Sequence, residues 1–341
     1  MSKLAFTLCA VSAFLVPLGS ENASGAESAA YRWTPVTLKA PFAGRDGAGA
    51  VVFKDRMWLL GGWNPGDRVH FPKVCNSEVW SSRDGLDWKL EVREAPWEGR
   101  HTAGYVVHDG KMWIVGGDAI LRHYQNDVWS SADGVQWTRV TDRAPWCPRV
   151  LHHTLAHGNR IWVMGGQTLP QFVPSVPQVV IHNDVWNSAD GATWVLVAKS
   201  AAWSPRGMIG GSAVFQGRMW ILGGGTYDTP STPARRFYND IWSSADGVAW
   251  TRHLEKAPWP PRQYHEVAVF DGKLWVLEGW DGRGNRNDVW CSSDGVEWHE
   301  VPGTPWAPRH AASVFVFQNA LWMVAGNNMF PDVWKLTPVA K

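Results

Sequence analysis

Short apolar runs and polar turns alternate along this chain, and the pattern returns at intervals of roughly 50 residues. The unit is clearest at 126–137, which reads Asn-Asp-Val-Trp-Ser-Ser-Ala-Asp-Gly-Val-Gln-Trp, and near-copies begin at Asn183, Asn239 and Asn287. A looser copy begins at Asn76. Apolar runs separated by tight polar turns predict β-hairpins. The chain is therefore one β unit repeated six times.

Each unit begins at an arginine, and a tryptophan in the second apolar run follows 13 residues later, or 14 in the fourth unit. That run ends in most units at a glycine pair, such as Gly61-Gly62. An acid then precedes a third run, and a Ser-x-x-Asp-Gly turn, as at 130–134, leads to a fourth. Asp tolerates the turn geometry and Gly supplies positive φ, so this turn predicts another hairpin. The unit arginines are Arg45, Arg100, Arg149, Arg206, Arg262 and Arg309.

The sixth unit stops after its third run, at Trp334. Its missing fourth strand is found at the other end of the repeat region, because 33–42 aligns with 137–146. We expect the N-terminal strand to complete the last sheet and to close the array into a ring, which removes its open ends. The predicted fold is all-β, a six-bladed β-propeller of four-stranded blades.

The succession of an arginine, an apolar hairpin, Gly-Gly, Asn-Asp-Val-Trp and a distal tryptophan resembles the kelch repeat over essentially all of 31–341. The Ser-Ala-Asp-Gly-x-x-Trp turn is similar to the Asp-box of sialidase propellers, with a spacing one residue shorter. The resemblance implies kelch-type blades. It leaves the chemistry open, because the kelch family contains both interaction scaffolds and enzymes.

Residues 1–30 have the character of a signal peptide. A charged start at Lys3 precedes an apolar run at 4–18 that is too short to span a membrane, and small residues precede candidate cleavage sites after Ala26 and Ala30. We expect 31–341 to be one exported propeller, periplasmic or extracellular, monomeric and without a membrane span.

The composition excludes some partners. A formal net charge of +1 over 341 residues provides no global field that would attract nucleic acid or an acidic membrane.

Outside the signal peptide, Cys75, Cys147 and Cys291 occupy non-equivalent positions, so at most one disulfide forms, and free thiols are the alternative. No metal or cofactor is predicted, because the histidines near the unit arginines lack the carboxylate-histidine spacing of a metal site: His101, His152, His153, His265 and His310.

Length variation is confined to one set of loops. Between the glycine pair and the acid, the six units have 15, 9, 17, 15, 8 and 5 residues, whereas the hairpin turns are uniform. These loops share a face with the connections between blades, hereafter the loop face, and we expect a ligand site there at the channel mouth. Of the 25 tryptophans, Trp63 and Trp280 alone fall outside the repeated core positions, and both follow the glycine position. We predict that they stack on a ligand such as a sugar; packing of the loops on one another is the alternative.

The six unit arginines lie on the same face, at the start of each innermost strand. Forked guanidinium groups around a channel suit a carboxylate, sulfate or phosphate, so all six are candidate ligand-binding residues, together with Tyr264. The alternative is a ring of structural ion pairs between blades. Each unit supplies one acid for such a pair: Glu78, Asp127, Asp184, Asp240, Asp288 and Asp332.

The fifth unit has titratable groups that the repeat does not require. Glu278 replaces the first glycine of the pair, and Glu266 follows His265. A carboxyl at the end of an inner strand beside a tryptophan would have a raised pKa suited to acid–base chemistry. Glu278, Glu266 and His265 are therefore the candidate catalytic residues. A salt bridge to a repeat arginine, or to Arg283 or Arg286, is the alternative.

These features favour a binding module whose loop face holds a carbohydrate or a protein partner. For a protein partner, the loops at 168–181 and 225–238 would provide an exposed apolar patch that includes Phe172, Val173, Val176, Val179 and Val180. The alternative is a mutarotase or epimerase of an acidic sugar, because periplasmic sialic-acid mutarotases are similar exported kelch propellers. Galactose oxidase is also similar, and its adjacent Tyr-His pair matches Tyr264-His265. We find no counterpart here of its Tyr-Cys cross-link or of its C-terminal domain, so a copper oxidase is less favoured.

Overall fold

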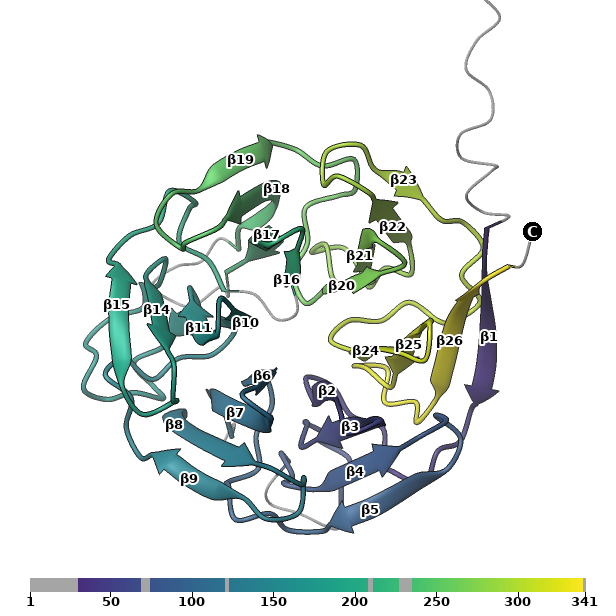
Figure 1. Ribbon diagram of the computed structural model, residues 1–341, viewed down its shortest axis with the longest axis horizontal. Coiled ribbons are helices and arrows are strands. Elements are labelled where there is room, and N and C mark those ends of the chain that lie inside the picture. Colours follow the sequence, from purple (N-terminus) through teal and green to yellow (C-terminus); the bar gives the residue numbers. More distant parts are fainter. Residues whose placement is uncertain (1–29, 69–73, 120–122, 208–210, 227–234, 340–341) are drawn as a thin grey trace, which may run out of the picture.

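The computed structural model describes residues 30–68, 74–119, 123–207, 211–226 and 235–339. Six four-stranded antiparallel sheets surround a central axis as the blades of a propeller (Figure 1). The predicted fold class is confirmed. Among the described residues, no helical segment has the length and apolar character needed to cross a bilayer. The predicted signal peptide lies outside the described residues, apart from Ala30.

Within each blade the strands pair in order from the channel outward. Blade 1 consists of β2 (Gly49–Phe53), β3 (Arg56–Leu60), β4 (Val79–Ser82) and β5 (Trp88–Val92). Blade 2 consists of β6 (Gly104–His108), β7 (Lys111–Asp118), β8 (Tyr124–Ser131) and β9 (Thr138–Thr141). Blade 3 consists of β10 (His153–His157), β11 (Arg160–Met164), β14 (Val185–Ser188) and β15 (Trp194–Ala198). Blade 4 consists of β16 (Ser212–Phe215), β17 (Arg218–Gly225), β18 (Phe237–Ser244) and β19 (Thr251–Leu254). Blade 5 consists of β20 (Glu266–Phe270), β21 (Lys273–Leu277), β22 (Val289–Ser292) and β23 (His299–Glu300). Blade 6 consists of β24 (Ser313–Phe317), β25 (Ala320–Val324), β26 (Val333–Pro338) and β1 (Tyr31–Thr37). A two-stranded ribbon, β12 (Gln167–Thr168) and β13 (Val180–Ile181), lies in the long loop of blade 3.

The N-terminal strand closes blade 6, as the sequence predicts. β1 pairs antiparallel with β26, with Trp33 opposite Leu336. Figure 1 shows the purple first strand beside the yellow last one. Tyr31 also packs edge-on against Trp275 of blade 5, with 4.9 Å between ring centroids. The ring is therefore closed by pairing of the first and last strands of the propeller.

The turns between the third and fourth strands repeat one hydrogen-bond pattern. In blade 2, Ser131 Oγ accepts the N–H of Gly134 at 2.8 Å, and Asp133 Oδ1 accepts the N–H groups of Val135 and Gln136 at 2.8 Å. The same pattern occurs in blades 1, 3, 4 and 5. These side chains satisfy the backbone donors of the turn, which explains why Ser and Asp recur there.

Each of these turns also packs against the neighbouring blade. At Gly134 φ is +82°, and an added Cβ would lie 2.2 Å from the ring of Trp58 in blade 1. Turn glycines of blades 1, 3, 4 and 5 make the equivalent close contact with a second-strand tryptophan of the preceding blade. The buried tryptophans that hold adjacent blades together therefore require a residue without a side chain opposite them.

The substitution Gly134→Ala tests this contact. We expect it to lower the free energy of unfolding by about 2–4 kcal/mol, because the new methyl group meets a buried indole and the backbone has positive φ. Gly110→Ala is the matched control: φ is +65° and nothing lies within 4 Å of its Cβ, so the conformational cost of about 1 kcal/mol is expected alone. Chemical denaturation measures both variants, and equal losses would show that the contact between blades contributes nothing.

Candidate functional site

The six unit arginines lie at the base of the loop face, and each pairs with the acid of its own blade. Arg309 binds Asp332 through two hydrogen bonds of 2.7 Å and donates to the carbonyl oxygens of Ala307 and Ala325. The other pairs are Arg45–Glu78, Arg100–Asp127, Arg149–Asp184, Arg206–Asp240 and Arg262–Asp288. The six arginine side chains are at most 1% exposed, which favours the structural ion-pair alternative over binding of an anionic ligand.

The main chain of the same arginines joins neighbouring blades. The carbonyl oxygen of Arg100 accepts the N–H of Gly62 in blade 1 at 2.9 Å. The equivalent bond to the preceding blade is formed at Arg45, Arg206, Arg262 and Arg309. The ion pairs thus lie within a blade, and the backbone makes the connection to the next blade. This corrects the expectation that the ion pairs themselves run between blades.

In the five units where it is described, the second residue after the unit arginine belongs to a collar around the channel mouth. The described members have φ between +52° and +60°, and they are Gly47, Thr102, Leu151, Tyr264 and Ala311. Thr102 donates its N–H to Gly47, Gly47 to Ala311, and Ala311 to Tyr264, at 2.9–3.0 Å. These bonds link blades 2, 1, 6 and 5 in order around the channel mouth.

The two extra tryptophans lie just outside this collar, at equivalent positions of blades 1 and 5. Trp63 pairs through its backbone with Asp46, and Trp280 pairs with Gln263; both partners directly follow a unit arginine. Both tryptophans are half-buried. The structure therefore places them on the loop face beside the channel mouth, where their neighbours differ.

Trp280 is the centre of an aromatic cluster at the junction of blades 4 and 5. Phe237 packs edge-on against its ring, with centroids 5.5 Å apart. The guanidinium group of Arg235 lies over the same ring, 4.5 Å from its centroid. Trp280 and Phe237 are half-buried and Arg235 is exposed, so the cluster is open to solvent.

Polar and aromatic groups extend the cluster toward blade 6. Asn285 pairs with Trp280, and its Oδ1 lies 2.7 Å from Nδ1 of His310. Asn285 also donates to Oδ1 of Asn327 at 3.1 Å. His310 stacks on the collar residue Tyr264, with centroids 4.9 Å apart and planes 28° apart. The cluster thus reaches from the rim of blade 4 to the collar.

The charge around Trp280 is positive. Arg235 and Arg236 are exposed at the start of β18, and Arg283 is exposed in the loop that follows Trp280. Arg286 is half-exposed and pairs with Asp281. Among the described residues of this sector there are four arginines and one acid, which favours an anionic group on any ligand that approaches it.

The described neighbours of Trp63 include two buried acids, Asp46 and Asp118. Its backbone pairs with Asp46 and Cys75, and its ring lies 6.4 Å from that of His101. Asp118 pairs with His101 on the adjoining blade. Burial raises the pKa of Asp46 to about 6, and His101 opposes the rise. The two tryptophans therefore occupy the same repeat position but have different charged neighbours.

Loop lengths shape the loop face around Trp280. The loops of blades 5 and 6 have 8 and 5 residues between the glycine position and the acid, against 15 in blade 4 and 17 in blade 3. Trp280 therefore lies beside the two shortest of these loops, with Phe237 and Arg235 on its blade 4 side.

The apolar side chains of the blade 3 loop are packed rather than exposed. Phe172 stacks on Tyr124 of blade 2, with centroids 4.9 Å apart and planes 17° apart. The loop residues form one cluster with the collar residue Leu151, and its members are Tyr124, Val150, Leu151, Leu169 and Val173, with Phe172, Val176, Val179 and Tyr264 packed against them. The expectation of an exposed apolar patch is therefore wrong for 168–181, because the β12–β13 ribbon folds this loop back onto the propeller. Of 225–238, the segment 227–234 lies outside the described residues.

The candidate catalytic acids lie below the collar. Glu278 has no exposed surface, and its Oε1 accepts the N–H of Ala312 in blade 6 at 2.9 Å. Burial raises the pKa of Glu278 to about 8, and the Ala312 N–H and Arg309 only partly oppose this. Burial also raises the pKa of Glu266, and the nearby Glu278 raises it further. Among the described residues, no arginine forms the salt bridge considered for these acids; Arg286 pairs with Asp281.

The adjacent Tyr264 and His265 do not form a joint site. His265 is fully buried, its Nε2 lies 2.8 Å from the carbonyl oxygen of Leu222 in blade 4, and burial together with Arg262 lowers its pKa to about 4. Tyr264 packs on His310 at the collar instead. Across the described part of the chain, no three side chains of the metal-binding kinds converge. The arrangement therefore gives no support to a copper site at this dipeptide.

No disulfide joins Cys75, Cys147 and Cys291, which decides between the two alternatives left open by their number. Cys75 is buried with its Sγ 3.8 Å from Nδ1 of His101. Burial raises the pKa of the Cys75 thiol, and nearby acids, led by Asp118, raise it further. The thiol is therefore unreactive at neutral pH.

Sequence reasoning missed Arg235, Phe237 and Asn285 as members of the site. Arg235 precedes β18 and Phe237 begins it, after a loop whose length is not set by the repeat, so their proximity to Trp280 depends on how this loop meets blade 5. A usable signal existed for Asn285, which lies five residues after Trp280 in a short loop and is absent from the repeat pattern.

Comparison with known proteins adds no family to this description. No family model matches the chain, and no curated protein is significantly similar to it. The function must therefore be inferred from the site itself.

Proposed function

We propose that this protein is an exported kelch-type binding module that recognises an acidic carbohydrate on the loop face over blades 5 and 6. The observation that carries the proposal is the half-exposed Trp280 with the Arg235 guanidinium 4.5 Å from its ring centroid. A flat apolar ring beside a forked cation offers one surface to the C–H face of a sugar and another to its carboxylate.

The rest of the cluster supports recognition of a polar ligand. Asn285 and Asn327 provide amide groups beside the ring, and His310 and Tyr264 continue the surface to the collar. The strands beneath are paired and the unit ion pairs are buried, so these groups stand on a rigid support. A rigid site loses less conformational entropy when it binds.

An enzyme that acts on an acidic sugar is the second candidate. The observation in its favour is the raised pKa of Glu278 and Glu266, which suits a general acid. Both acids lie below the collar, whereas Trp280 lies above it, so a sugar bound at Trp280 does not meet them without movement of the collar. NMR of anomer exchange distinguishes the candidates. If the protein accelerates the exchange of sugar anomers and Glu266→Gln abolishes this acceleration, the enzyme is the correct candidate and the binding module is not.

The binding proposal is tested by calorimetric titration with oligouronides, sialylated oligosaccharides and their neutral counterparts. We expect the acidic sugars to bind and the neutral ones not to, with affinity that falls as salt is added. Trp280→Ala and Arg235→Ala are expected to weaken binding by about 10- to 30-fold, the loss typical of a central contact residue.

Arg83→Ala is the matched control, because Arg83 is an exposed arginine in the β4–β5 turn on the opposite face. It should bind like the wild type. If Trp280→Ala also binds like the wild type, or if no acidic sugar binds at millimolar concentration, the proposed site is wrong.

A further inference from the structure

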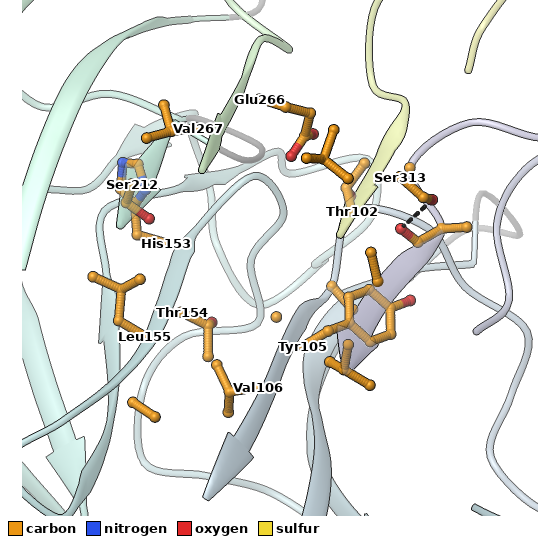
Figure 2. A pocket seen from close by; sticks show the side chains of 18 of the residues that line it. Thr102, Tyr105, Val106, His153, Thr154, Leu155, Ser212, Glu266, Val267 and Ser313 are labelled. Carbon is orange, nitrogen blue, oxygen red and sulfur yellow. Dashed lines mark hydrogen bonds between the residues drawn. The ribbon is translucent and has the colours of Figure 1, made fainter. Parts of the chain in front are cut away.

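Below the collar, the channel contains a cavity of about 400 Å³ lined by the innermost strands of all six blades (Figure 2). The lining is polar on the collar side, where Thr102, Thr154, Ser212, Glu266 and Ser313 contribute. On the side of the short turns it is apolar, with Val52, Val107, Ala156 and Val214. The loop-face site does not use this space, so the cavity requires an explanation of its own.

Glu266, the first residue of β20, is the distinctive group in the cavity. Among the described lining residues it is the one carboxyl, and none is a lysine or an arginine. Its side chain enters the cavity with Thr102 and Ser313 to one side and His153 and Ser212 to the other (Figure 2). No described residue donates a hydrogen bond to its carboxyl or pairs with it, so an ionised Glu266 has no counter-ion from the described protein groups.

The charged and titratable groups near Glu266 do not supply that counter-ion. Arg262 and Arg309 are engaged by Asp288 and Asp332. Burial lowers the pKa of His153 well below its ordinary value and that of His265 to about 4, so both rings are neutral. Glu278 is near enough to raise the pKa of Glu266 and would add repulsion if both were ionised.

Three residues that line the cavity have buried hydroxyl groups with no partner among the described residues. Thr102 is 3% exposed, lines the cavity, and has an Oγ1 without a hydrogen-bond partner. Tyr105 and Thr154 also line the cavity, and their hydroxyl groups are buried and lack a partner. Buried hydroxyl groups left unpaired are costly, so a site that uses their lone pairs is favoured.

We propose that the channel cavity binds one monovalent cation, ammonium or an alkali ion, with Glu266 as its counter-ion and neighbouring hydroxyl oxygens as neutral ligands. A single carboxylate balances one positive charge, whereas a divalent ion would keep an uncompensated charge in a confined site. Oxygen ligands suit such hard cations. The cavity lining includes none of Trp280, Arg235, Phe237 and Asn285, so this site is separate from the one at Trp280 and does not depend on it.

The cation and a proton compete for the same carboxyl group. Burial and Glu278 raise the pKa of Glu266, so at neutral pH a cation must displace a proton. The affinity for the cation should therefore rise about tenfold for each unit of pH. This rise ends at the pH where Glu266 is already ionised in the protein that holds no cation.

Thermal unfolding of the purified protein tests the proposal, with ammonium, potassium and sodium chloride compared with choline chloride at equal ionic strength. At pH 8.5 we expect at least one of the small cations to raise Tm by about 2 °C above choline when its concentration is ten times Kd, and to raise it less at pH 6.5. Comparison of the three salts separates ammonium from the alkali ions. If no small cation exceeds choline at either pH, the proposal is wrong.

The variants assign the effect to the cavity. Glu266→Gln keeps the shape of the protonated acid and should abolish the difference between small cations and choline, and Thr102→Val should reduce it. Glu255→Gln, an exposed acid on the outer rim, is the matched control and should keep the full difference. An equal response of Glu266→Gln and wild type would overturn the proposal.

Crystals of the unaltered protein soaked in rubidium chloride provide a second measurement that does not depend on the folding of a variant. An anomalous peak in the channel beside Glu266 is expected. Peaks confined to the outer surface would overturn the proposal.

Discussion

Arg309→Ala is expected to lower the free energy of unfolding by about 3–5 kcal/mol, because it leaves Asp332 as a buried charge without its partner. The side chains are 0% and 6% exposed. The guanidinium also donates to the carbonyl oxygens of Ala307 and Ala325, which would be left without that donor. Urea denaturation of wild type and variant measures the loss.

An exposed ion pair provides the control for Arg309→Ala. Arg139 lies 2.9 Å from Asp142, and the two side chains are 54% and 68% exposed. Arg139→Ala should therefore cost about 1 kcal/mol or less. Replacement of both Arg309 and Asp332 by leucine should recover part of the loss, because no buried charge then remains. If Arg309→Ala loses no more than Arg139→Ala, the buried pair does not hold the blade together and its arginine is available for another role.

Glu278→Gln is expected to change how stability depends on pH. The folded-state pKa of Glu278 is raised to about 8 from an ordinary value of 4.5. As the pH rises from about 4.5 to about 8, the unfolded chain loses this proton while the folded protein keeps it. The unfolded state is thereby favoured, by up to about 1.4 kcal/mol per pH unit.

The glutamine variant has no such proton to lose, and its Oε1 still accepts the N–H of Ala312. The difference in unfolding free energy between Glu278→Gln and wild type should therefore grow in favour of the variant by a few kcal/mol between pH 5 and pH 8. It should level off above pH 8. Glu266 keeps a residual slope in both proteins, because its pKa is raised as well. Parallel stability curves for the two proteins would show that Glu278 is ionised in the folded state.

The propeller could be predicted from the sequence because its strand pairs are local or follow from the repeat. The hairpin around 108–110 and the turn at 130–134 each join strands that are neighbours in the chain. The one distant pairing, β1 with β26, was visible because 33–42 continues the sixth unit in the same register as 137–146. The same repeat spacing predicted that the long loops share one face and that Trp63 and Trp280 lie on it beside the channel mouth.

The chemistry of the site was not accessible in this way. Whether Arg309 is a ligand-binding group or half of an ion pair depends on its distance from Asp332, which the repeat does not state. The positive sector around Trp280 arises where the blade 4 loop meets blade 5, and the burial of Val173 arises where the blade 3 loop meets the collar.

The sequence by itself therefore determined the blades, their number and their closure, because a repeated pattern of apolar runs and turns specifies local strand pairing. Only the tertiary structure decided which side chains meet at the mouth and which, like Glu266, face the channel. Those contacts join non-repeating residues of different blades, and their energies depend on burial and on distances that no spacing along the chain encodes.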